Sequence, residues 1–115
     1  MTDQRFIIEM GMGTVQYGQD YTKAATRAIE DAIRHSSIPL FDATGVGHDA
    51  MRVQVTVGVA KPEQVDCNAL AAVLPRGRET VRAVAGGMDV ENPETGTLTV
   101  IAMAAVEAFL PYQGA

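Results

Sequence analysis

Ionisable and polar side chains crowd into one short stretch near the middle of this chain. His48 and Asp49 follow a loop with two glycines, and Arg52 and Gln54 come next, on alternate positions of a strand pattern. Histidine exchanges a proton near neutral pH, aspartate can orient it, and arginine binds a carboxylate or similar planar anion through two hydrogen bonds. We therefore predict His48 and Asp49 as catalytic residues and Arg52 and Gln54 as ligand-binding residues.

Two charged residues from other parts of the chain are predicted to join this ligand site. Lys23 lies in the first turn of a predicted helix, where the dipole mildly disfavours a cation, so it either pairs with Asp20 or faces an anionic ligand. Glu9 lies on the strand face that we expect to carry Arg52. Neighbours in an extended segment point to opposite sides, so one of the pair at 48–49 is expected to hold the loop instead of the ligand.

A metal centre or a bound cofactor is not predicted. His48 has no second histidine near it, because His35 lies at the end of the predicted helix, where an imidazole complements the last carbonyls. Cys67 is the single cysteine and has no metal-ligand spacing. The glycines at 11 and 13 do not begin a dinucleotide fingerprint, because Gln16 stands where the third glycine belongs. These glycines are more typical of a turn or a close approach of backbones.

Composition and charge exclude several classes of function. The chain has 115 residues, which suits one domain, and its 14 acidic and 9 basic residues give a net charge of -5. A nucleic-acid-binding protein needs a cluster of lysine and arginine to neutralise phosphates, and this sequence has none. Neither a secretory leader nor an apolar run of bilayer length is evident, so we expect no membrane contact and a cytoplasmic protein.

The periodicity of apolar residues predicts the elements that position these side chains. Residues 5–12 alternate as a strand, and residues 21–35 follow a helical period after Asp20, a good N-cap. The clearest strand is 51–60, followed by a short helix at 62–72 and a third strand at 79–85. Residues 97–110 alternate as a fourth strand; the competing prediction, from its alanine content, is a helix at 101–110.

This order predicts an α+β fold, β-α-β-α-β-β, with a four-stranded mixed sheet, two helices on one face and a hairpin joining the last two strands. The other face is expected to carry Glu9, Arg52, Gln54 and Thr56, with Arg82, Thr99 and Glu107 depending on register. It is too apolar for a fully solvated surface, given Ile7, Gly11, Gly58, Ile101 and Met103. We therefore predict a subunit interface there, and a homo-oligomer.

Three segments together resemble an uncharacterised family of bacterial and archaeal hypothetical proteins of about this length. They are residues 18–25 (GQDYTKAA), 48–53 (HDAMRV) and 92–96 (NPETG). The turn at 15–17 departs from the family, whose members often carry an acidic residue and a histidine there, so we assign that turn no role. The strand order is also similar to the YjgF-like fold of the small trimeric chorismate mutases. That likeness implies a trimer with helices outside and ligands in clefts between subunits.

Two hypotheses from different classes follow. The first is a homo-oligomer that binds a small polar or anionic metabolite between subunits, with His48 and Arg52 available for catalysis. The second is a non-catalytic assembly in which Arg52, Glu9 and Glu107 form ion pairs across the interface and fix its geometry. The sequence identifies neither a substrate nor a reaction.

Overall fold

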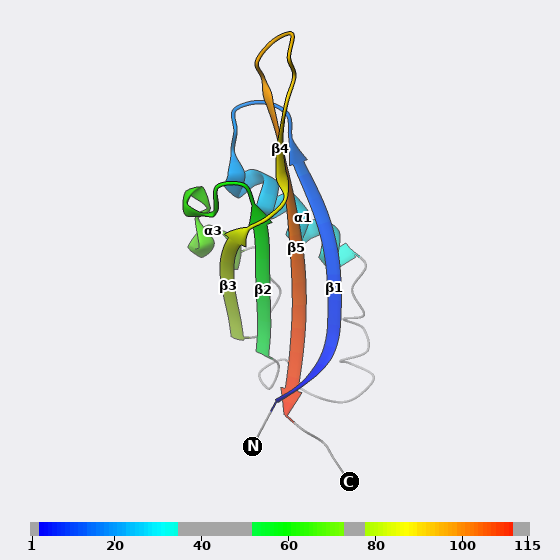
Figure 1. Cartoon of the computed structure of the whole chain (residues 1–115). Helices are drawn as coiled ribbons and strands as arrows, with labels where there is room; N and C mark the ends of the chain where they lie inside the picture. Colours follow the sequence, from blue (N-terminus) through cyan, green and yellow to red (C-terminus); the bar gives the residue numbers. More distant parts are fainter. Residues whose placement is uncertain (1–2, 35–51, 73–77, 112–115) are drawn as a thin grey trace.

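The computed structural model describes residues 3–34, 52–72 and 78–111 and shows an α+β fold (Figure 1). The strands are β1 (Asp3–Val15), β2 (Arg52–Val59), β3 (Arg78–Ala85), β4 (Met88–Glu91) and β5 (Leu98–Pro111). The helices are α1 (Tyr21–Arg34) and α3 (Cys67–Ala71), with a 3₁₀ turn at Pro62–Gln64. The α+β class is confirmed, but the mixed sheet has five strands where the sequence predicted four.

The long last strand lies in the middle of the sheet. The order is β1-β5-β2-β3, with β5 antiparallel to both β1 and β2, and β2 parallel to β3. Residues 101–110 are therefore strand, and the helical alternative is excluded. The predicted hairpin between the third and last strands is wrong, because β3 lies beside β2 and the short β4 forms the hairpin with β5.

Glycines allow the chain to cross from the β3 side of β2 to β5. A Cβ on Gly58 would lie 3.3 Å from the Cα of Gly86, so the two backbones almost touch where the chain passes the end of β2. Gly87 has φ +58, and a Cβ there would lie 2.1 Å from the carbonyl oxygen of Ile101. Gly87 therefore stands at a crossing that only glycine permits.

Both helices cover the same face of the sheet (Figure 1), as predicted. The core beneath them combines small residues of α1 with branched residues of the strands and is completed by Leu70 of α3. In β2 every second residue is buried, and these are Val53, Val55, Val57 and Val59. The stripe of α1 that meets the sheet is mostly alanine, namely Ala24, Ala25, Ala28 and Ala32 with Ile29.

The alanine stripe brings α1 into direct contact with the backbone of β1. A Cβ on Gly11 would lie 2.3 Å from the carbonyl oxygen of Ala28, and one on Gly13 would lie 2.4 Å from that of Ala24. The glycines therefore face the helix, and Met10 and Met12 point to the opposite side. The prediction that Gly11 lies on the face away from the helices is wrong; the close approach of backbones is confirmed.

The helix boundaries follow local capping. Asp20 caps α1, because its Oδ1 accepts a hydrogen bond of 2.9 Å from the backbone N–H of Lys23. The predicted second helix is split, because Asp66 starts a new helix by accepting a bond of 3.1 Å from the N–H of Ala69. None of the helices in the described residues has the length and apolar character to cross a bilayer.

Candidate functional site

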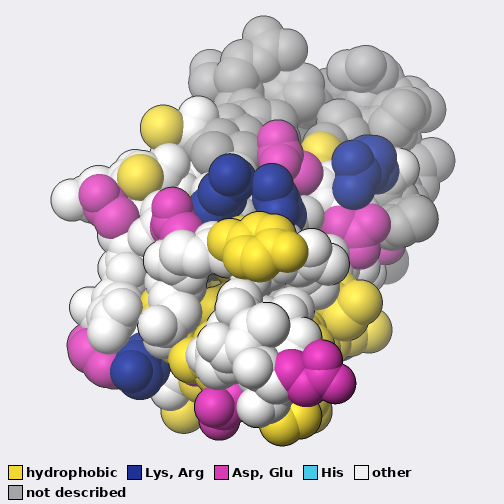
Figure 2. All heavy atoms as spheres, turned by 90° about the horizontal axis from the view of Figure 1, so that it is seen from above, with side chains coloured by type: hydrophobic (Ala, Val, Ile, Leu, Met, Phe, Trp, Pro, Cys, Tyr) yellow, Lys and Arg dark blue, Asp and Glu magenta, His cyan; other side chains and the backbone are white. Residues whose placement is uncertain are grey.

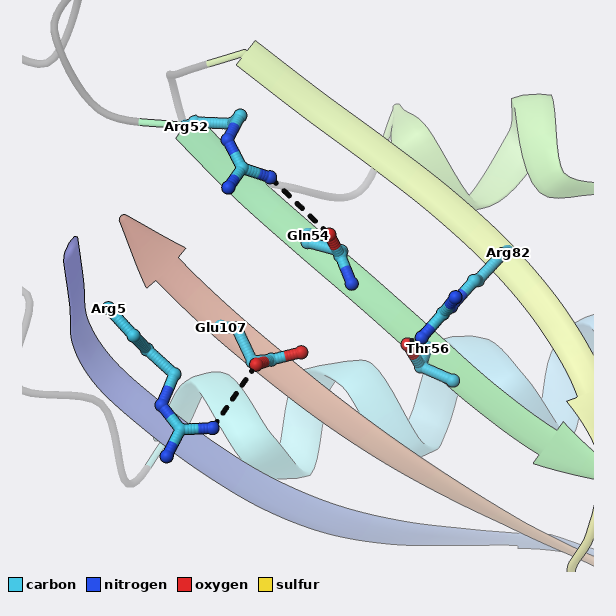
Figure 3. A network of polar contacts seen from close by, with 6 residues as sticks. All are labelled: Arg5, Arg52, Gln54, Thr56, Arg82 and Glu107. Atoms are coloured by element: carbon cyan, nitrogen blue, oxygen red, sulfur yellow. Dashed lines mark hydrogen bonds and ion pairs between the residues drawn. The ribbon is translucent and has the colours of Figure 1, made fainter. Parts of the chain in front are cut away.

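We call the sheet face opposite the helices the open face. Along β2 this face carries Arg52, Gln54 and Thr56, all half-buried (Figure 3). Arg52 donates a hydrogen bond of 3.3 Å to Oε1 of Gln54, and its guanidinium lies 4.1 Å from the centre of the Phe109 ring on β5. The stack and the hydrogen bond hold a planar cation against the sheet, which suits a carboxylate or another flat anion.

Two further arginines reach the same part of the open face from the neighbouring strands (Figure 3). Arg82 of β3 donates a bond of 3.0 Å from Nε to the hydroxyl of Thr56, and Arg5 of β1 forms an ion pair of 3.3 Å with Glu107 of β5. Among the described side chains, no carboxylate pairs with Arg82. We call Arg52, Gln54, Thr56 and Arg82 the polar row. This region is therefore rich in cations, in a chain whose net charge is -5.

The rest of the open face is apolar and exposed. Among the described residues, seven of the eight large hydrophobic side chains that are exposed lie on it, by their register with β2 and β5. We call these seven the apolar patch: Ile8, Met10, Met12, Val84, Met88, Val90 and Met103. A shallow apolar hollow at its centre is lined by Met10, Gly58 and Met103, and it reaches Thr56 in the polar row. Apolar and cationic surfaces therefore adjoin on one face.

The structure brings together only part of the predicted site. Arg52 and Gln54 are in contact, as their alternate positions required. Glu9 is on the other face, because it pairs with Val106, which packs against the core. Lys23 is exposed on α1, also on the helix side of the sheet. The predicted catalytic residues His48 and Asp49 lie outside the described residues, as does His35.

Several other residues that were predicted to lie on the open face are found there. Thr99, Ile101, Met103 and Glu107 alternate with buried residues of β5 and therefore lie on it, as expected. The side chain of Ile7 is outside the described set. In the described part of the chain, no three His, Cys, Asp or Glu side chains lie close enough to hold a metal ion.

A second group of residues lies at the hairpin end of the molecule, and of these only Lys23 was predicted from the sequence to contact a ligand. Figure 2 views this end and shows Lys and Arg side chains gathered next to a large hydrophobic side chain. Two hollows meet here. One is lined by Lys23 and Arg27 and the other by Asn92, Thr95, Thr97 and Thr99, while Gln16 and Tyr17 line both. Tyr17 is 76% exposed and is the one member of the exposed hydrophobic set outside the apolar patch.

A buried tyrosine and a carboxylate connect α1 to the hairpin. The Tyr21 hydroxyl donates a short hydrogen bond to Oδ2 of Asp89 in β4. Burial, followed by the hydrogen bond to Asp89, raises the pKa of the Tyr21 hydroxyl above its ordinary value. The second oxygen of Asp89 is buried, and no hydrogen-bond partner for it exists among the described residues. This contact fixes the hairpin to the helix.

Comparison with known proteins identifies relatives but no activity. Residues 5–108 match the family described as conserved hypothetical protein (Lin0512_fam). The fold is similar to the crystal structure of an FtsZ-like protein of unknown function from Nostoc punctiforme, with 41% sequence identity and a TM-score of 0.85. That match covers 97% of this chain and 99% of the other. No functionally curated protein matches the sequence.

Proposed function

This chain belongs to the Lin0512 family of conserved hypothetical proteins, and we propose that it is a homo-oligomer that binds a small polar or anionic metabolite where its open sheet faces meet. The observation that carries the proposal is the gathering of seven exposed hydrophobic residues and three arginines on one face of one sheet. The apolar patch supplies the subunit contact and the polar row supplies the ligand contact.

A second copy of this chain is the occupant that the apolar patch fits best. The seven side chains together expose several hundred Å², which is at or above the largest patch of a typical monomer. A stable interface buries about 800 Å² on each partner, so the patch with its polar border is of suitable size. A sheet face packs well on another sheet face, and identical faces brought together by symmetry give a closed assembly.

The polar row is suited to an anion because its cations are already oriented. Arg52 is held by Phe109 and Gln54, and Arg82 by Thr56, so little side-chain entropy remains to be lost on binding. A neighbouring subunit over the apolar patch would exclude water from the edge of the row and strengthen each charged contact. We expect His48 and Asp49 to take part if the bound metabolite reacts.

The number of subunits follows from the likeness to YjgF-like proteins, which predicts a trimer. That likeness concerns the expected strand order only, and a dimer of open faces is the alternative assembly. Light scattering coupled to size exclusion measures the mass of the assembly directly and decides between three copies and two.

The subunit contact is tested by placing a charge in the apolar patch. Met10 is 67% exposed, so Met10→Lys should leave the monomer folded but place an unpaired cation in the interface. We expect the assembly to dissociate to monomers, as measured by light scattering, with an unchanged far-UV circular dichroism spectrum. Tyr17→Lys is the matched control, because Tyr17 is also highly exposed but lies outside the patch. A monomeric wild-type protein would contradict the proposal.

The ligand contact is tested by a thermal-shift screen against carboxylated and phosphorylated metabolites. A ligand present at about a hundred times its Kd adds roughly 2.7 kcal/mol to stability. We expect Arg82→Gln and Arg52→Gln to abolish the shift without changing the mass of the assembly. Arg34→Gln is the control, because Arg34 is an exposed arginine of α1. If Arg52→Gln instead dissociates the assembly and no metabolite shifts the wild type, the non-catalytic assembly is the better account.

A further inference from the structure

We infer that the hairpin end carries a second ligand site, built around Tyr17, that binds a planar ring bearing a phosphate group. This site is separate from the polar row, although its Thr99 lies on the open face beside Val90 of the apolar patch. Leu98, near the hairpin, and Phe109, beneath Arg52, are at opposite ends of β5, roughly 35 Å apart at the usual rise per residue. We call Gln16, Tyr17, Lys23, Arg27 and the threonines of the hairpin the Tyr17 site.

The ring of Tyr17 forms the platform of this site. Tyr17 stands in a turn that continues through Gly18, with φ +87, and Gln19, with φ +46. A left-handed conformation at a residue other than glycine costs free energy and persists where the surrounding structure requires it. The turn presents a large aromatic side chain to solvent, at 76% exposure, between two hollows. An exposed aromatic ring of this kind is a stacking surface for another ring.

The hollow on the helix side of Tyr17 is suited to a phosphate. Lys23 and Arg27 are four positions apart on α1, so their like charges face the same side and repel each other. Neither forms an ion pair with a carboxylate among the described residues. Arg27 donates a bond of 2.6 Å to the carbonyl oxygen of Thr14, which holds its guanidinium at the hollow. A phosphate monoester carries close to two negative charges at neutral pH and so matches this pair of cations.

The hollow on the hairpin side is polar and uncharged. Thr95, Thr97 and Thr99 line it, and the Thr95 hydroxyl lies 3.0 Å from that of Thr97. The turn is fixed, because Oδ1 of Asn92 accepts a bond of 3.0 Å from the backbone N–H of Glu94. Hydroxyls both donate and accept hydrogen bonds, so they suit the mixed polar edge of a ring or sugar. A ring on Tyr17, with its phosphate at Lys23 and its polar edge at the threonines, occupies both hollows.

Calorimetric titration of the full-length protein tests this site with adenosine, guanosine, cytidine and uridine monophosphates. Inorganic phosphate and the four nucleosides serve as partial probes. We expect at least one monophosphate to bind with one site per chain, and more tightly than either of its parts. Tyr17→Ala should weaken that binding about 5- to 100-fold, and Tyr17→Phe, which keeps the ring, should change it less than about threefold.

Charge variants test the phosphate contact. Lys23→Ala should weaken monophosphate binding about 3- to 10-fold, with a smaller dependence on salt, while Lys61→Ala, which removes an exposed lysine elsewhere, should leave it unchanged. The proposal would be overturned if inorganic phosphate bound as tightly as every monophosphate. It would also be overturned if Tyr17→Ala left the affinity for the monophosphates unchanged. The absence of binding at millimolar concentration would overturn it as well. None of these results depends on Arg52, Arg82 or the mass of the assembly, so this site and the proposed function can fail separately.

Discussion

The two faces of one sheet are built from opposite kinds of residue. On the helix side, β1 presents Gly11 and Gly13, whose Cα atoms lie against the backbone of α1. On the open side the same strand presents Met10 and Met12, which are exposed. At these positions of β1 the face covered by the helices, which we call the closed face, carries the smallest residues, and the open face carries long, flexible ones. Methionine adapts to irregular surfaces, so it suits a contact that forms after folding.

This difference shows that the distance between β1 and α1, more than the hydrophobicity of the side chains, decides which side of β1 is buried. A helix of small residues lies so close that a methyl group at either glycine would overlap its backbone. The larger apolar side chains are left for the other side. The closed face should then be intolerant of added volume and the open face tolerant of it.

The largest effect is expected from adding volume to the closed face. Gly13→Val would place a branched side chain against the carbonyl oxygen of Ala24 and force α1 away from β1. We expect a loss of roughly 3 kcal/mol or more in the free energy of unfolding, measured by urea denaturation. Thr14→Val is the matched control, because its side chain is exposed on the open face, and it should change stability by less than about 0.5 kcal/mol. Equal effects at the two positions would refute the contrast.

A smaller effect is expected at the contact between α1 and the hairpin. Tyr21→Phe removes the donor to Asp89, whose other oxygen already has no partner among the described residues, and should cost about 1 to 3 kcal/mol. Because the folded-state pKa of Tyr21 is raised, its contribution is complete below about pH 10 and is lost as pH rises through the folded value. Urea denaturation at pH 8 and above pH 10 should show the wild-type advantage shrinking. Tyr17→Phe, at an exposed ring, should leave both the stability and its pH dependence unchanged.

The smallest effect is expected on the open face. The ion pair between Arg5 and Glu107 joins side chains that are 52% and 18% exposed, so solvent screens it. Glu107→Gln should cost less than about 1 kcal/mol, and the difference should vanish in 1 M salt. Both proteins carry Met10→Lys as well, because this substitution is expected to keep the chain monomeric and the open face free of a second copy. Glu94→Gln, at an exposed hairpin residue, gives the baseline. A salt-independent loss of several kcal/mol would mean that the pair is buried by something outside the described residues.

Residue periodicity was enough to predict most of the fold. The alternation of β2 and β5 located both strands, and the Asp20 cap located the start of α1, because these signals depend on neighbours in the chain. Periodicity misassigned the faces of β1, because the close approach of α1 is a tertiary feature. The short β4 was missed because its four residues, MDVE, have too few apolar positions to show a period.

The candidate sites divide in the same way. Arg52 and Gln54 share a face because they are two positions apart on a strand. This spacing is visible in the sequence alone. Of the Tyr17 site, only Lys23 was predicted to contact a ligand, because the residues of the site come from three separate segments that only the folded sheet brings together. Two local signals pointed to it: a basic pair four positions apart and an aromatic residue beside a glycine in a turn. Neither signal distinguishes a ligand site from ordinary solvated surface without the fold.

The position of β5 between β1 and β2 has a consequence for how this protein is made. Arg5 and Glu107 meet across strands although they are 102 positions apart in the chain. During synthesis β1 and β2 have no common partner until β5 leaves the ribosome, so the sheet is expected to close late and slowly, because its pairings are non-local. Until then the apolar sides of both strands are exposed together. The nascent chain is therefore expected to depend on chaperones more than its size suggests.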